Sequence, residues 1–502
     1  MTTRLEGRVG VVTGMDGTVG TPVVAGTREG AVVVSSDLSA EKALATSAID
    51  TETEVPERPP VDNEGRDAMT RQRHHRAFWM VSFAFLSVMA FSGVPSPLYG
   101  LYRARDHFSL FMVTVIYAVY AVGVIGSLLL AGHLSDWYGR RRLLVPALCV
   151  ATVSAVVFVV SKNLTGLLLG RLINGIAIGV VVSTATAYLS ELHAVGRPEA
   201  SPRRAQLIAS AIPVGGLGLG ALVAGLLAQW VAYPLTVPYL VFLAALVLGT
   251  IGVALSPETH HGPIPRPRYR PQRVSVPINE RGTFFATALS TFVAFATVGL
   301  FTGLSAVFLA TSLHQSSHAL AGTVLGVMFA AGVGTQILIA AWPIRREYEA
   351  GVAAMLLGLG LAVLAMWLNP PSLGLFMAGG ALIGAGGGGA IFKAGVATVM
   401  RISPPDRMAE SVAGLFLASF VGISLPVVGA GITLSRHVSP KATLLGFAIA
   451  VGVGIAVSAI RLLAPTSAAG GGGPAPARRS TGSSEQNHDQ PSTDDPNERR
   501  AA

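Results

Sequence analysis

Two cations lie inside long apolar stretches of this sequence. Arg171 occurs early in the stretch 166–189, and Lys393 follows the glycine-rich run 384–389 in the stretch 373–397. A charge within a bilayer costs at least about 2.5 kcal/mol, and such residues normally face a partner or a watery cavity. Either side chain can line a cavity and bind an anionic group, or reach the membrane surface along its own apolar stem. Both interpretations stay open for each residue.

Several uncharged polar residues also lie within apolar stretches and are candidates for contact with a small-molecule substrate. They are Tyr117, Tyr120, Asn174 and Gln336. No Asp or Glu falls in the middle of an apolar stretch, and Glu191 stands at the end of one. A titratable acid deep in the membrane is the usual site for a coupled proton, so its absence argues against proton exchange and favours an anionic or neutral substrate.

The run from Gly132 to Arg142 is the densest charge cluster between two apolar stretches. It contains Asp136 and the triple arginine Arg140, Arg141 and Arg142. Lys and Arg accumulate in loops on the cytoplasmic side of a membrane. The run is therefore predicted to be a short cytoplasmic hairpin between two transmembrane helices.

The composition agrees with a polytopic membrane protein. The chain has 502 residues, of which 51% are hydrophobic and 13% charged, against about 25% charged in soluble domains. The net charge of +9 is spread over loops rather than gathered on one face, which argues against a nucleic-acid partner. The single cysteine, Cys149, excludes a disulfide framework, and no phosphate-binding loop of the Gly-x-x-x-x-Gly-Lys-Ser/Thr type occurs.

A bilayer-spanning helix needs about 20 apolar residues, and windows of that length predict an all-α integral membrane protein of twelve helices. The windows are 77–98, 109–132, 143–161, 166–189, 205–230, 235–255, 284–308, 319–341, 350–368, 373–397, 409–432 and 443–463. The arginine-rich loop 256–283 divides them into two six-helix bundles, 77–255 and 284–463. The segments 1–76 and 464–502 are predicted to be disordered tails. Alternating arginine content places both tails in the cytoplasm.

The pattern Gly-x-Leu-Ser-Asp-x-x-Gly-Arg-Arg at residues 132–141 resembles the loop signature of the major facilitator superfamily of transporters. The resemblance implies two pseudo-symmetric bundles that rock around a central substrate site. It implies a conformational gate at Gly132, Asp136, Gly139, Arg140, Arg141 and Glu191. In that gate Asp136 faces the N-terminus of the eleventh helix, and Arg140 pairs with Glu191. Arg171 occupies the position that the superfamily associates with proton coupling.

The fifth predicted helix bears on the direction of transport. It keeps the glycines Gly216, Gly220 and Gly225 of the exporter signature Gly-x-x-x-Gly-Pro-x-x-Gly-Gly. Ala221 replaces the proline and Ala224 the penultimate glycine, and Pro426 in the eleventh helix is a possible counterpart bend. The glycines are also explained by close helix packing alone.

Our first hypothesis is therefore a proton-coupled exporter of drug-like molecules or small metabolites, acting as a monomer in the plasma membrane without cofactor or metal. The alternative is an uptake symporter for a sugar or an organic anion. Two other classes stay open. One is an enzyme that uses the glycine segment 10–20 as a nucleotide loop, although its spacing matches poorly. The other is a membrane sensor that does not transport.

Overall fold

The computed structural model describes residues 23–24, 32–33, 63–260 and 269–463. It divides into two units, Met1–Ala68 and Met69–Ala502. In the first unit, strand β1 (Val23–Val24) pairs antiparallel with β2 (Val32–Val33). The glycine segment 10–20 and the tail 464–502 lie outside the described residues. Helix α2 begins at Asn63, inside the segment 1–76 that was expected to be a tail.

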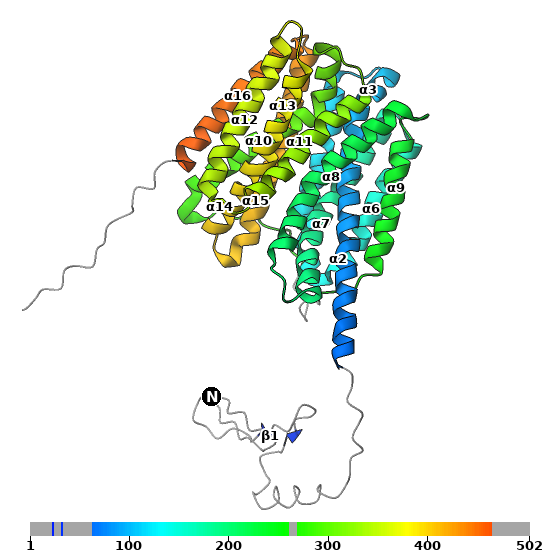
Figure 1. Ribbon diagram of the computed structural model, residues 1–502, viewed down its shortest axis with the longest axis vertical. Helices are drawn as coiled ribbons and strands as arrows, with labels where there is room; N and C mark the ends of the chain where they lie inside the picture. Colours follow the sequence, from blue (N-terminus) through cyan, green and yellow to red (C-terminus); the bar gives the residue numbers. More distant parts are fainter. Residues whose placement is uncertain (1–22, 25–31, 34–62, 261–268, 464–502) are drawn as a thin grey trace, which may run out of the picture. The chain divides into compact units, whose positions relative to one another are not determined.

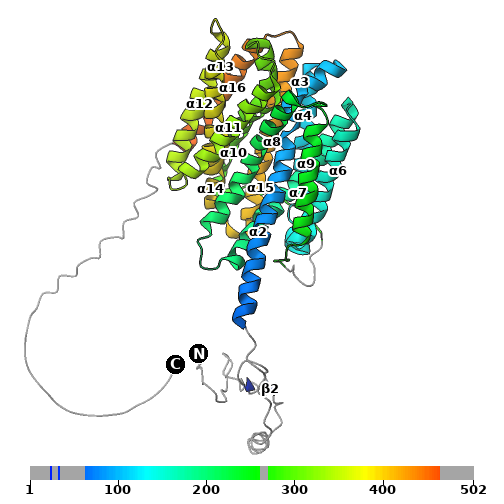
Figure 2. The same cartoon turned by 45° about the vertical axis from the view of Figure 1, so that its right-hand side comes forward.

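All long elements described in the second unit are helices (Figures 1 and 2). Its first group is α2 (Asn63–Gly93), α3 (Pro95–Asp106), α4 (Leu110–Ala131), α5 (Ser135–Tyr138), α6 (Arg140–Val160), α7 (Leu164–Gly196), α8 (Arg203–Trp230) and α9 (Val237–Ala254). Its second group is α10 (Arg281–Ser312), α11 (His318–Leu338), α12 (Ile344–Trp367), α13 (Leu373–Ile383), the π-helix η2 (Gly384–Ile391), α14 (Phe392–Ile402), α15 (Met408–Ser435) and α16 (Pro440–Leu462). Short 3₁₀ turns, η1 (Ile278–Glu280) and η3 (Pro405–Arg407), precede α10 and α15.

The prediction of twelve transmembrane helices is confirmed. Within the described ranges, twelve helical stretches are long and apolar enough to cross a membrane. Two stretches are irregular. The first is broken between α2 and α3, where Pro95 cannot donate a helical hydrogen bond. The tenth runs through α13, η2 and α14, and the central η2 contains the run Gly386 to Gly389.

Glycines set how closely the helices approach. A Cβ on Gly216 would lie 2.6 Å from the Met89 Cβ, and one on Gly220 would overlap the Ala90 carbonyl, so both glycines pack α8 against α2. A Cβ on Gly225 would lie 2.9 Å from the Cα of Gly322, which joins α8 to α11 across the two groups. Pro426 lies within the continuous helix α15.

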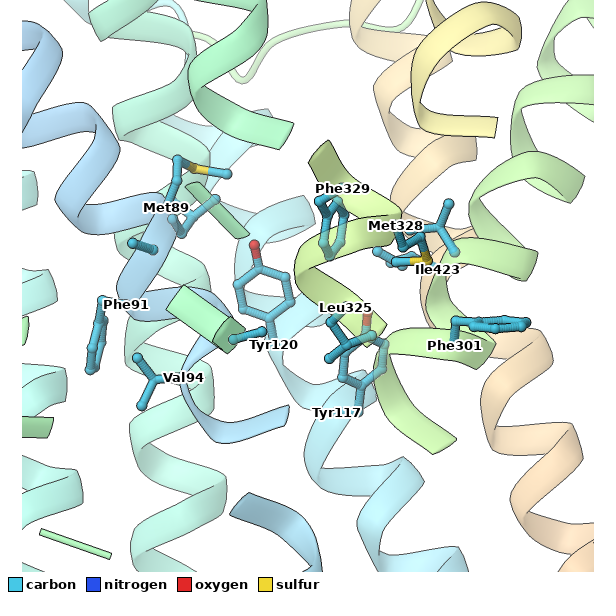
Figure 3. Close-up of a cluster of buried hydrophobic side chains, with 14 of the residues drawn as sticks. Met89, Phe91, Val94, Tyr117, Tyr120, Phe301, Leu325, Met328, Phe329 and Ile423 are labelled. Atoms are coloured by element: carbon cyan, nitrogen blue, oxygen red, sulfur yellow. The ribbon is translucent and has the colours of Figure 1, made fainter. Parts of the chain in front are cut away.

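Direct contacts between the two groups lie at the centre of the bundle and toward the end opposite the arginine-rich loops. Gln229 at the end of α8 accepts hydrogen bonds from the Ser317 hydroxyl (3.2 Å) and the His318 amide (3.0 Å) at the start of α11. In the centre, Tyr117 and Tyr120 of α4 share one buried cluster with Leu325 and Phe329 of α11 (Figure 3). Tyr117 and Tyr120 thus lie where the two groups of helices meet.

Candidate functional site: a buried arginine and two charged latches

Arg171 is almost fully buried, with 1% of its surface exposed, and does not reach the membrane surface. Its guanidinium donates to the Tyr99 hydroxyl from Nε (2.9 Å) and Nη2 (2.5 Å), and to the Ser92 carbonyl from Nη1 (2.9 Å). The Cζ lies 5.5, 6.0 and 5.7 Å from the ring centres of Tyr99, Tyr117 and Tyr120. The interpretation in which Arg171 extends to the surface is therefore wrong.

The contacts that Arg171 makes within the described part of the chain are with neutral groups. Among the residues that the structure describes, no Asp or Glu forms an ion pair with Arg171. Aromatic faces attract a cation but do not cancel its charge. The arrangement can therefore supply hydrogen-bond donors and positive potential to a polar or anionic group that enters beside it.

Asn174 lies one helical turn after Arg171 and is fully buried. Neither its amide nitrogen nor its oxygen has a hydrogen-bond partner. Leaving a buried polar group unpaired costs about 1–3 kcal/mol, and an amide offers two donors and an acceptor. The Asn174 amide is therefore free to bind a hydroxylated ligand.

Gln336 presents a similar group from the second bundle. Its Nε2 donates to the Gly388 carbonyl of η2 at 2.9 Å, while its buried Oε1 has no partner. A Cβ at Gly388 would meet nothing within 4 Å, so the π-helix borders open space at this point. Turns of π-helix occur often at functional sites. Asn174 thus offers a fully unpaired amide, and Gln336 an unpaired amide oxygen, from opposite halves of the protein.

The first charged latch, at the arginine-rich end, joins Arg140 to Glu191. Nη2 of Arg140 lies 2.9 Å from the Glu191 carboxylate, and Nη1 lies 2.5 Å from the Asp136 carboxylate. The Arg140 side chain is only 9% exposed, whereas that of Asp136 is 57% exposed. The structure thus places Arg140 beside Glu191. The expected meeting of Asp136 with the N-terminus of α15 stays a prediction, because here the carboxylate bonds within the first bundle.

Glu258, which follows α9, was not recognised in the sequence. Its carboxylate accepts hydrogen bonds from the backbone amides of Arg140 (2.7 Å), Arg141 (3.3 Å) and Arg142 (3.3 Å). Glu258 therefore caps the N-terminus of α6. A negative charge is favourable at that end of the helix dipole. Arg141 strengthens the same junction by donating to the Ser256 carbonyl at 3.1 Å. An acid directly after an apolar span was the only signal in the sequence.

Replacing Gly139 by alanine is expected to destabilise this junction. Gly139 has φ 101° and ψ 152°, a backbone conformation that is essentially confined to glycine, and a Cβ would lie 2.7 Å from the Glu258 carboxylate. We expect a loss of about 1–3 kcal/mol, seen as a lower Tm in detergent. Gly360→Ala in α12, where a Cβ meets nothing within 4 Å, is the matched control. Equal Tm values for the two variants would contradict this assignment.

The last part of the loop between the two bundles connects the gate hairpin, residues 132–142, to α15. Gln272 donates its backbone amide to the Leu129 carbonyl at 2.8 Å, and the Ser275 amide donates to the Glu410 carbonyl at 3.4 Å. The Tyr269 ring stacks on His133 of the gate hairpin, with ring centres 5.8 Å apart. Burial lowers the pKa of His133 below its ordinary 6.5, which favours the neutral form of the stacked ring. The loop 269–277 therefore bridges the two bundles at the arginine-rich end.

The second charged latch joins Lys393 of α14 to Glu347, in the first turn of α12. Lys393 also donates to the Ile339 carbonyl at 3.2 Å. The side chain of Glu347 is 3% exposed and that of Lys393 is 28% exposed. Glu347 was missed in the sequence because an acid at the start of a span is normally solvated. Lys393 is thus anchored by a carboxylate beside the turn between α11 and α12, and both interpretations of this residue, cavity and surface, stay predictions.

A family model described as Major Facilitator Superfamily matches residues 80–347, which is more than half of the chain. The chain belongs to the Major Facilitator Superfamily. It is accordingly a multi-pass membrane transporter rather than an enzyme.

Two crystal structures of the nucleoside transporter NupG share the superfamily fold. The first, of a mutant form, has a TM-score of 0.59 and 11% identity over 77% of this chain and 99% of its own. The second has a TM-score of 0.57 and 12% identity over 78% of this chain and 99% of its own. At this level of identity the likeness concerns the fold alone.

Curated relatives in the superfamily match over short segments. An arabinose-proton symporter of Bacillus subtilis is 32% identical over 89 residues, 17% of this chain and 19% of its own length. Glucose transporter GlcP of Staphylococcus epidermidis is 44% identical over 62 residues, 12% and 14% of the two chains. Monosaccharide-sensing protein 2 of Arabidopsis thaliana is 37% identical over 76 residues, 14% and 10%. The matches thus span at most about a fifth of these relatives.

Proposed function

We propose that this transporter takes up a sugar or a chemically similar hydroxylated molecule, organic anions included, by alternating access. The observation that carries the proposal is the fully buried Asn174 amide without a partner, one turn from Arg171. A sugar offers hydroxyls that can both donate to and accept from such an amide. Its apolar faces can pack on aromatic rings of the kind that Tyr117 and Tyr120 present.

Arg171 suits the same class of substrate. Its guanidinium is held between a carbonyl, a hydroxyl and three aromatic rings, without a carboxylate among the described residues. Hydrogen bonds from a charged donor are worth about 1.5–3 kcal/mol, more than those from a neutral donor. A sugar oxygen or an acid group beside Arg171 gains this bonding, whereas a cationic drug would be repelled by the unpaired charge.

The relatives support uptake more than export. Two of them are named for sugar transport, one of these for proton symport, and a third for monosaccharide sensing. The exporter hypothesis depended on the gate pattern and on Gly216, Gly220 and Gly225, which pack α8 against its neighbours. Close packing accounts for these glycines without an export function. Proton coupling, a monomeric state, cytoplasmic termini and a plasma-membrane location complete the proposal.

The test is uptake of labelled arabinose, glucose, inositol and small organic anions by a host that lacks its own carriers. We expect uptake of one class, and its loss on addition of a protonophore. Asn174→Leu should reduce that uptake at least about tenfold, because one or more hydrogen bonds to substrate are lost. Thr186→Val is the control on the same helix, since among the described residues the exposed Thr186 hydroxyl donates to the Val182 carbonyl of its own helix.

The opposite outcome is equally clear. If the protein lowers accumulation of dyes or antibiotics, and takes up none of the sugars or anions, the exporter hypothesis replaces this one. If neither movement occurs although the protein reaches the membrane, a sensor without transport is the better interpretation. Equal uptake by wild type and Asn174→Leu would remove Asn174 from the substrate site.

A further inference from the structure

A cavity of about 290 Å³ lies outside the substrate site, at the arginine-rich end of α2. Its lining combines the polar side chains of Gln72, Arg73 and Arg76 with the apolar side chains of Met69, Ala77, Met80 and Leu255. Ser256 and Pro257 complete its wall. The lining residues of α2 recur at helical spacing, so they form one stripe along the helix.

The two arginines bring uncompensated positive charge to this cavity. Both are exposed, and no ion pair joins either of them to an acidic residue in the part of the chain that the structure describes. Outside the cavity lining, Arg204 of α8 places its Cζ 5.9 Å from the ring centre of the exposed Trp79 of α2. Exposed tryptophan and arginine at a helix end are typical of the membrane interface.

The apolar lining of the cavity continues along α2 and α9 toward the centre of the membrane-spanning helices. Met80 is 39% and Leu255 66% exposed, and the exposed Phe83 of α2 and Ile251 and Leu248 of α9 extend the same surface. A soluble anion gains nothing from such a surface. An amphiphile gains binding energy from both kinds of lining. Its charged head contacts the arginines, and its chain covers the exposed apolar groups.

We propose that this cavity binds the headgroup of an anionic phospholipid. The phosphate lies between Arg73 and Arg76, and an acyl chain runs over Met80 and Leu255. Basic residues beside a transmembrane helix attract anionic lipids in this way. The proposal is independent of the transported substrate.

The site adjoins the gate hairpin. The Pro257 carbonyl, in the cavity wall, accepts a hydrogen bond from the Tyr188 hydroxyl, and the next residue, Glu258, caps α6. A lipid bound in the cavity would therefore restrict the motion of the turn at Pro257 and Glu258, which caps α6.

The test is native mass spectrometry of the full-length protein in detergent, with equal amounts of phosphatidylglycerol and phosphatidylcholine of identical chains. We expect preferential retention of phosphatidylglycerol, and roughly a tenfold or greater loss of that preference in the double variant Arg73→Gln/Arg76→Gln. The matched control is Arg71→Gln/Arg346→Gln, which removes the same charge from exposed residues outside the cavity.

Equal retention of the two lipids by the wild type, or equal losses in the two double variants, would overturn the proposal. Thermal unfolding with added glycerol 3-phosphate or inorganic phosphate separates a lipid site from a soluble-anion site. If either soluble anion raises the Tm as much as phosphatidylglycerol does, the cavity binds free phosphate and the lipid assignment fails. Leu255→Ser gives a further check, since it should weaken lipid retention only.

Discussion

Arg171→Leu is expected to abolish transport, by about a hundredfold or more in rate, while leaving the protein folded. In the proposed substrate site, the Arg171 nitrogens that donate to Tyr99 and Ser92 are the donors that a substrate would share. Two hydrogen bonds from a charged donor to substrate, at about 1.5–3 kcal/mol each, correspond to a hundredfold or more in rate when both are lost. The measurement is the initial rate of substrate uptake, normalised to the amount of protein in the membrane.

The same substitution is expected to change the Tm little, because the cost of leaving the Tyr99 hydroxyl and the Ser92 carbonyl unpaired offsets the gain from removing a buried cation. Burying a cation without a counter-ion is costly, and replacing buried charge by an apolar side chain of similar volume is often neutral or stabilising. Arg171→Lys keeps the charge but loses the planar guanidinium that donates to Tyr99 and Ser92 at the same time. We therefore expect a transport rate between those of the wild type and Arg171→Leu. Arg105→Gln, which removes an exposed arginine of α3 paired with Asp106, is the control. A large drop in Tm for Arg171→Leu would identify Arg171 as structural.

Lys393→Met is expected to destabilise the second bundle by about 3–5 kcal/mol. Removing the lysine leaves Glu347, whose side chain is 3% exposed, as an uncompensated buried charge. Glu347→Gln should cost less, because the Lys393 side chain is 28% exposed and keeps its bond to the Ile339 carbonyl. The Tm of the purified protein, followed by tryptophan fluorescence or circular dichroism, measures both effects.

The double variant Glu347→Gln/Lys393→Met is expected to recover most of the stability lost in Lys393→Met, since no buried charge remains. The exposed pair of Arg345 and Glu349 is the matched control. Its side chains are 60% and 45% exposed, so Arg345→Ala should change the stability by less than about 1 kcal/mol. Additive effects of the two single substitutions at Glu347 and Lys393 would show that the pair does not act as a unit.

The two latches differ in how far the sequence could anticipate them. Arg140 and Glu191 were recognisable as a pair because both fall in loops or helix ends whose places the superfamily pattern defines. Lys393 was recognisable as a costly charge, but its partner Glu347 is 46 residues away and lies in the first turn of another helix. Which face of α12 turns toward α14 depends on packing, as where Gly351 approaches Ile391 of η2. Hydropathy alone contains no such information.

The sequence by itself determined the twelve spans, their division by an arginine-rich loop and the residues whose burial would be costly. These properties depend on local composition, because a lipid environment demands apolar length and internally paired backbone in every span. Only the tertiary structure decided what each costly residue meets. Arg171 meets Tyr99, 72 residues away, and Glu258 reaches Arg140 across 118 residues. Such contacts depend on how helices rotate and approach one another, and that is set by close packing over the whole bundle rather than by any local pattern.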